Sequence, residues 1–124
     1  MAEPLNALEA ALAAALERRA TMAEFLAVLA ASQIIVPSAT EVLADGSGLA
    51  PLSQWRQGIE LIVVFTDPAR IGNSLHAQAP WQLKVDAAWL IRHLALDRGL
   101  LLFAGPERGL MLTPAQLAEI RATL

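Results

Sequence analysis

Cysteine is absent from this chain of 124 residues. Disulfides, thiolate metal sites and cysteine nucleophiles are therefore excluded, and the redox compartment is left open. Positive charge is also scarce, because nine lysines and arginines stand against twelve acidic residues and the formal net charge is −3. A nucleic-acid-binding protein normally concentrates its basic residues in a patch or has a high pI. The scattered cations argue against binding to DNA or RNA.

Targeting and membrane-spanning segments are also not found in the sequence. Residues Met1–Pro4 lack the basic region that opens a secretory signal peptide. The longest apolar stretch, Met22–Val36, is interrupted by Glu24 and Gln33. It is shorter than the roughly 18–20 residues that cross a bilayer. We therefore expect a cytoplasmic protein without a membrane span, and secretion by a route without a cleavable signal stays open.

Apolar residues make up 56% of the chain, above the roughly 45–50% of soluble globular proteins. A chain of this length forms one ordinary domain, so residues 1–124 are interpreted as a single domain. Part of the excess is alanine and leucine, which favour helices. The rest predicts surface that an isolated monomer would leave uncovered. We expect self-association as a homo-oligomer, or a protein partner on the same patch.

The most informative segment is the apolar run over residues 59–66, which ends at Thr66 and is followed by Asp67 and Pro68. It predicts a buried strand that leads directly into a helix. Asp67 is suited to cap that helix, and Pro68 is suited to its first position. We expect the helix to extend to about Leu75.

Two helices are predicted ahead of this strand. Leucines at spacings of three and four predict an amphipathic helix over residues 4–19, which would start in the turn that contains Pro4. Thr21 and Glu24 form a capping box that begins a second helix, ending near Ser32. Its expected buried face is Met22, Phe25, Leu26 and Leu29. A strand is predicted over residues 33–37, and residues 49–58 fit either a short strand or a loop.

The second half of the chain alternates strands and helices. The predicted elements are a connector at 76–80, a strand at 81–85, a helix from Asp86 to about Leu96 closed by Gly99, a strand at 100–104, a turn at 105–109, a hairpin partner at 110–112 and a last helix begun by Thr113 and Pro114. The predicted fold class is α+β (mixed α/β). Two N-terminal helices are followed by a mixed sheet of about five strands with helices packed on it.

Three segments, Phe25–Pro37, Val64–Arg70 and Leu100–Pro114, occur in an order that resembles the SseB protein N-terminal domain family. The likeness extends from about Leu5 to Leu124. Asp67 stands where serine is usual in the family, and residues 103–105 replace an asparagine-proline-glycine turn. The resemblance implies a bacterial SseB-like domain and no catalytic residues. The family is associated by name with serine sensitivity and with type III secretion, and its members often carry a second, C-terminal domain.

Catalytic signatures are missing from the sequence. His76 has no partner at ligand spacing and is interpreted as a loop residue, whereas His93 lies one helical turn after Trp89, where ring packing explains it. The serines lack a G-x-S-x-G context. Residues 46–48 lack the lysine of a phosphate loop. We expect no catalytic residue, no metal site and no cofactor.

Two kinds of binding site remain as hypotheses. Trp55 and Trp81 are candidates for a partner-binding groove because tryptophan is enriched in binding hot spots, with packing in or around the core as the alternative for each. Thr66, Asp67 and Arg70 are candidates for a small-ligand site in which Arg70 contacts an anion. The sequence thus predicts a non-enzymatic protein-interaction domain. The alternative is a ligand-binding or regulatory domain with an anion site after the strand at 59–66, and an enzyme ranks last.

Overall fold

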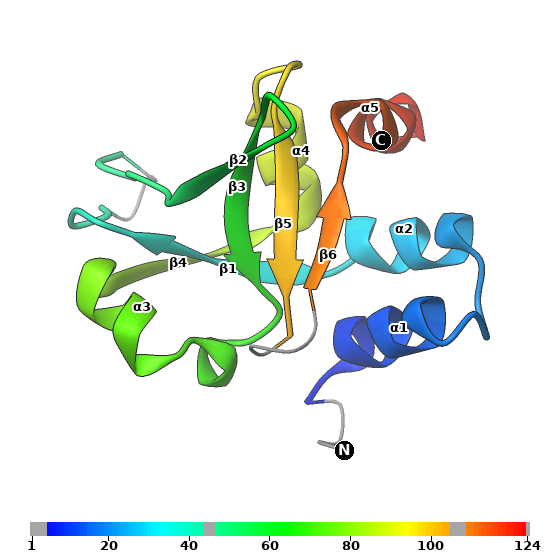
Figure 1. The fold of residues 1–124 in the computed structure, drawn as a ribbon, viewed down its shortest axis with the longest axis horizontal. Helices are drawn as coiled ribbons and strands as arrows, with labels where there is room; N and C mark the ends of the chain where they lie inside the picture. Colours follow the sequence, from blue (N-terminus) through cyan, green and yellow to red (C-terminus); the bar gives the residue numbers. More distant parts are fainter. Residues whose placement is uncertain (1–4, 44–46, 105–108, 124) are drawn as a thin grey trace.

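The computed structural model describes residues 5–43, 47–104 and 109–123, which form one mixed sheet with helices on both faces (Figure 1). Along the chain the elements are α1 (Ala7–Leu16), α2 (Met22–Ala30), β1 (Gln33–Ser38), β2 (Ser53–Arg56), β3 (Ile59–Phe65), the 3-10 helix η1 (Pro68–Arg70), α3 (Asn73–Gln78), β4 (Trp81–Asp86), α4 (Ala87–His93), β5 (Gly99–Phe103), β6 (Gly109–Leu112) and α5 (Pro114–Thr123). The predicted α+β class is confirmed, with six strands where about five were expected.

The strand order in the sheet is β4-β1-β3-β5-β6, and β2 pairs with the first part of β3. The central strands β3 and β5 run parallel, with Leu61–Phe65 opposite Gly99–Phe103. The other pairings among the described strands are antiparallel. Strands in the middle of a sheet that is covered on both faces are buried on both sides. This central position explains why β5 and Leu61–Phe65 of β3 are continuous apolar runs.

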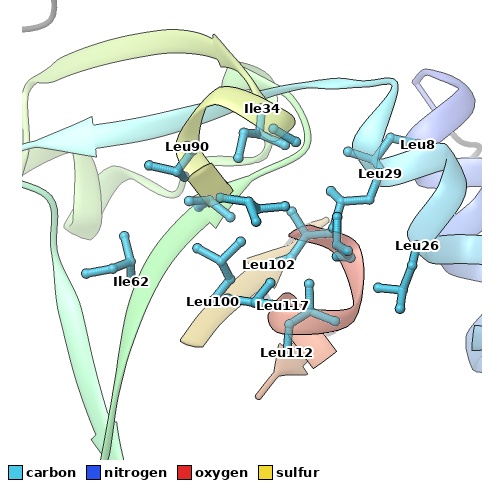
Figure 2. Packing of buried hydrophobic residues seen from close by; sticks show 14 of the residues in the cluster. Leu8, Leu26, Leu29, Ile34, Ile62, Leu90, Leu100, Leu102, Leu112 and Leu117 are labelled. Carbon is cyan, nitrogen blue, oxygen red and sulfur yellow. The ribbon is translucent and has the colours of Figure 1, made fainter. Parts of the chain in front are cut away.

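The main core lies between one face of the sheet and the four helices α1, α2, α4 and α5. Alternate residues of β3 and β5 point into it, among them Val64, Leu100 and Leu102, none of which is exposed. Figure 2 shows Leu102, Leu112 and Leu117 at the centre of this packing. Four helices therefore share a single sheet face.

The opposite face of the sheet carries a smaller cluster. Ile35, Val63 and Phe65 are buried there, and Ile71 and Leu75 pack against them from the segment around α3. In Figure 1, α3 (green) lies on the opposite side of the molecule from α1 and α2 (blue to cyan). This face therefore has a thinner cover than the main core.

The first helix is shorter than the periodicity predicts. It begins at Ala7, because the Asn6 side chain caps it by accepting the Glu9 N–H, and it ends at Leu16. Arg18 then has a φ of 60°, in the left-handed region, so the chain turns before the arginines can extend the helix. Pro4 lies outside the described residues.

The capping box of the second helix is confirmed, because the Thr21 hydroxyl accepts the Glu24 N–H and the Glu24 carboxylate accepts the Thr21 N–H. Its predicted buried face is correct for Phe25, Leu26 and Leu29 but wrong for Met22, which is 37% exposed. Met22 is the first residue of the helix and lies at the margin of the core.

The helix predicted from Pro68 to about Leu75 is wrong as a continuous element. Asp67 does cap a turn, by accepting the Ala69 N–H at 2.9 Å, but that turn is the 3-10 helix η1. Gly72 then takes an extended conformation as the N-cap of α3, which divides the segment. Because α3 continues to Gln78, the connector predicted at 76–80 begins as helix.

The prediction for residues 86–99 is also partly wrong. Asp86 makes no side-chain cap; its carboxylate instead accepts from the Gln33 amide at 3.4 Å, and α4 ends at His93. Gly99 is the first residue of β5 and does not close the helix. A Cβ at this position would lie 2.4 Å from the Leu112 carbonyl oxygen, which explains a glycine in the paired strand. The turn predicted at 105–109 falls largely on residues 105–108, which lie outside the described residues.

The ambiguous segment 49–58 contains a short strand. β2 pairs with β3 from Ser53 opposite Ile62 to Arg56 opposite Ile59. Between them, Gln57 and Gly58 have φ values of 53° and 79°. Two consecutive left-handed residues are typical of the two-residue hairpin turn that suits twisted strands. The hairpin places Trp55 on a strand.

Candidate functional site

The predicted site residues Thr66 and Arg70 lie together where α1 meets the carboxyl end of β3, and both contact Glu9. Arg70 Nε donates to Glu9 Oε2 at 2.9 Å, and Arg70 Nη2 donates to Glu9 Oε1 at 2.7 Å. The Thr66 hydroxyl also donates to Glu9 Oε2, and the Leu5 N–H donates to Oε1 at 2.9 Å. Glu9 is only 3% exposed. The geometry is the two-pronged pairing that arginine forms with carboxylates.

The environment of Glu9 favours its ionised form. Burial alone would raise the pKa of Glu9, but the hydrogen bonds from Arg70, Thr66 and Leu5 outweigh it and lower the pKa to about 2. The same pairing with Glu9 raises the pKa of Arg70 above its ordinary value. Both groups are therefore charged throughout the physiological pH range.

Asn6 also joins the start of α1 to the carboxyl end of β3. Its side-chain amide donates to the Thr66 carbonyl oxygen at 3.0 Å, while its side-chain oxygen caps α1. Asp67 is used as the cap of η1. An anion approaching Arg70 would meet the Glu9 carboxylate, which already holds the position that a bound anion would take. The polar groups of the corner thus attach α1 to the end of β3.

A half-open notch of about 260 Å³ adjoins this corner. It is lined by Asn6, Ala7, Leu8, Ser32, Gln33, Ile35, Thr66, Asp67, Pro68 and Lys84. Lys84 brings the one cationic side chain of this lining, and it is exposed. Nowhere in the described part of the chain do three histidine or acidic side chains gather as they would around a metal ion.

Trp55 lies apart from that corner, on β2, and is 69% exposed. It pairs across the hairpin with Glu60, whose carboxylate is 2.7 Å from Arg98 Nε. Trp55 and Glu60 line a hollow of about 350 Å³ together with Asp97 and Arg98 from the loop between α4 and β5. Leu96 in that loop is 77% exposed. The exposed aromatic ring thus shares its hollow with charged groups of both signs.

Trp81 begins β4 and is 42% exposed. It pairs with Ser38 at the end of β1. In the strand order β4 is the last strand at its end of the sheet, opposite β6. Trp55 and Trp81 are therefore surface residues on two different strands, and neither is buried in the core.

Sequence reasoning missed an apolar groove between α2 and α5. It holds about 410 Å³ and is lined by Met22, Ala23, Leu26, Ala27, Glu119, Ile120 and Thr123. Met22, which is 37% exposed, lines this groove where α2 begins. Sequence reasoning also missed Glu9, although Asn6 three residues earlier is a helix-start signal of the kind used for Thr21 and Glu24.

The two histidines occupy surface positions. His76 lies in α3 rather than in a connector, and it is exposed. His93 stacks on Trp89 with ring centroids 4.7 Å apart, and its Nδ1 lies 2.8 Å from the Trp89 carbonyl oxygen. The predicted ring packing between these two residues is confirmed.

The fold is that of a small α+β domain. The ion pair between Glu9 and Arg70 holds the domain's own elements together. The model of the SseB protein N-terminal domain matches residues 8–119, nearly the whole chain. The chain therefore belongs to this family, as the sequence resemblance implies. Neither a curated protein nor a solved structure matches it. Within the described ranges, no helix combines the length and the apolar character that crossing a membrane requires.

Proposed function

We propose that this domain acts by binding another protein and that it is not an enzyme. The observation that carries the proposal is Trp55, whose side chain is 69% exposed on a paired strand. A tryptophan buries about 150–250 Å² when fully covered. Covering the exposed part at about 25 cal/mol per Å² is worth on the order of 3–4 kcal/mol. A partner protein is the natural source of that cover.

The hairpin holds Trp55 in place before any partner arrives. β2 pairs with β3 along its whole length, and the tight turn at Gln57 and Gly58 closes it. A side chain on a fixed backbone loses less conformational entropy on binding than one on a mobile loop. Trp55 is therefore suited to act as a preorganised anchor.

The surroundings of Trp55 resemble the rim of a binding hot spot. Glu60, Arg98 and Asp97 line the adjoining hollow, so an apolar centre is bordered by charged groups of both signs. Protein interfaces commonly have an aromatic centre within a polar rim. We expect a partner that presents an apolar recess for the indole together with hydrogen-bonding groups.

The chemistry at the end of β3 supports a binding domain over an enzyme. Glu9 and Arg70, the two groups with shifted pKa values among the described residues, neutralise one another. A catalytic group needs a pKa matched to proton transfer near neutral pH and a free path to substrate. The alternative of an anion-binding domain requires Arg70 to exchange Glu9 for a ligand, and no observation favours that exchange.

The test compares three full-length chains with an affinity tag: wild type, Trp55→Ala and the control Leu16→Ala. Leu16 is 43% exposed on α1, so its substitution also removes exposed apolar surface. Proteins recovered from the native host are quantified by mass spectrometry. The recovered partner is then purified and its dissociation constant measured by titration.

We expect Trp55→Ala to weaken the purified complex by about 30-fold or more, which is the usual loss at a hot spot. Leu16→Ala should bind like the wild type. Circular dichroism and thermal unfolding should show that both variants keep the fold. Equal recovery and equal affinity for the Trp55 and Leu16 variants would refute the proposal, as would the absence of any partner enriched by the wild type.

A further inference from the structure

Strand β4 forms one end of the sheet, and its outer edge is unpaired by the described strands. All six of its residues pair with β1 on the inner side, from Trp81 opposite Ser38 to Asp86 opposite Gln33. No strand in the described ranges pairs with the outer side. An edge strand presents backbone N–H and C=O groups that can hydrogen-bond to another strand. β4 therefore offers a continuous template for one more strand.

The usual devices that block an open edge are weak here. Natural proteins shorten such strands, bulge them, or insert proline or charge. β4 has six residues in unbroken register with β1, and the nearest proline, Pro80, precedes it. Lys84 is the one basic side chain on the strand. Its effect depends on what lies opposite it in a partner strand.

One face of β4 carries an apolar stripe at the rim of the main core. Leu83 and Val85 pair with Val36 and Ile34, whose side chains lie in that core, so they point to the same face. Val85 packs against the core and both residues are half-buried, whereas Trp81 on the same face is 42% exposed. The core thus ends at an edge where apolar side chains are incompletely covered.

We propose that this edge pairs with the β4 edge of a second copy of the chain, antiparallel and centred on Leu83. This inference deepens the proposed function by naming a second copy as one partner, but it uses a different surface from Trp55. In a two-fold antiparallel pair, the residue on the axis faces itself. Centring on Leu83 places Trp81 opposite Val85 and Gln82 opposite Lys84. Each cross-strand pair is then compatible, apolar with apolar and amide with cation.

The neighbouring registers are worse for identifiable reasons. Centring on Lys84 places two lysines directly opposite each other, which is destabilising in antiparallel sheets. Centring on Gln82 leaves only residues 81–83 paired. Lys84 therefore does not block the edge; it selects the register centred on Leu83. The two copies would form one continuous sheet, with their apolar stripes adjoining on the same face.

The absence of cysteine from the chain allows a direct test of this register. Residues directly opposite each other in antiparallel strands have Cα atoms about 4.5–5.5 Å apart, which is within the range of a disulfide. Leu83→Cys should form a covalent dimer on mild oxidation of the full chain. Val85→Cys is the matched control, because four residues would separate the two sulfurs along the paired strands.

A second pair of variants leaves the monomer core untouched, since Gln82 is exposed. Gln82→Glu places a carboxylate opposite Lys84, and Gln82→Lys places two lysines opposite each other. Each change acts twice in a two-fold dimer. We expect the dissociation constant of the dimer to be about tenfold or more higher for Gln82→Lys than for Gln82→Glu. Sedimentation velocity over a concentration series measures both values.

Three outcomes would overturn the inference: a monomer at every concentration, cross-linking of Leu83→Cys no faster than that of Val85→Cys, or equal or reversed affinities for the two Gln82 variants. Neither readout involves Trp55. A failure at β4 with intact partner capture therefore refutes only the self-pairing. Equal partner binding by the Trp55 and Leu16 variants, or no partner enriched by the wild type, together with intact self-pairing refutes only the role of Trp55.

Discussion

Replacing Glu9 by glutamine removes the charge that joins α1 to the end of β3 while keeping the size of the side chain. The pKa of Glu9 falls from an ordinary 4.5 to about 2, and each pH unit corresponds to about 1.36 kcal/mol. The ionised carboxylate thus contributes on the order of 3 kcal/mol to the free energy of unfolding at neutral pH. Because the pKa in the folded state is depressed, this contribution is present above about pH 5 and is lost as the pH falls toward 2.

The measurement is urea unfolding of the wild type and of Glu9→Gln at a series of pH values. We expect the wild type to be more stable by about 3 kcal/mol at pH 7, with the difference shrinking steadily below pH 5. Other carboxylates titrate in both proteins and cancel in the difference. The control Glu60→Gln breaks the more exposed pair with Arg98 and should cost about 1 kcal/mol or less. A difference between wild type and Glu9→Gln that is the same at pH 3 and pH 7 would refute the reasoning.

Two further stability predictions follow from local geometry. Thr21→Ala removes the capping hydroxyl of α2 and should lower the free energy of unfolding by about 1 kcal/mol; no loss in urea unfolding would show that the cap is dispensable. Gly99→Ala places a Cβ 2.4 Å from the Leu112 carbonyl oxygen and 2.7 Å from Leu61 Cδ2, so the paired strands must separate. We expect a loss of about 2 kcal/mol or more. Gly72→Ala meets no atom within 4 Å and should stay near wild-type stability, so equal effects of the two glycine substitutions would contradict the steric argument.

The parts of the fold that could be predicted from sequence are those whose signals are local. The capping box at Thr21 and the strand over residues 59–66 needed only a few neighbouring residues, and both are confirmed. The same holds for Thr113, whose hydroxyl accepts the Gln116 N–H at the start of α5. Gly72 shows where local reasoning fails, because the helix-start signal at Asp67 and Pro68 does not reveal that the chain leaves the helix after Arg70 and starts a new one at Asn73.

The candidate site was harder to predict because its partners are distant in sequence. Arg70 and Glu9 are 61 residues apart, and only the docking of α1 against β3 brings them together. Their pairing depends on tertiary structure, so no spacing rule could show that Arg70 is occupied. The exposure of Trp55 likewise depends on where its hairpin lies at the margin of the sheet. The tryptophan side chain alone suggested a role at an interface, whereas its position on the surface follows from how the strands are arranged.

The central position of β5 has a consequence for synthesis on the ribosome. Its leucines complete the main core, yet Gly99–Phe103 is translated after four strands and four of the α-helices. Until then the nascent chain carries apolar residues such as Leu12, Phe25 and Val64 without the strand that they will cover. Domains of this size generally fold as units. Shielding by chaperones should therefore matter most during translation of the first hundred or so residues.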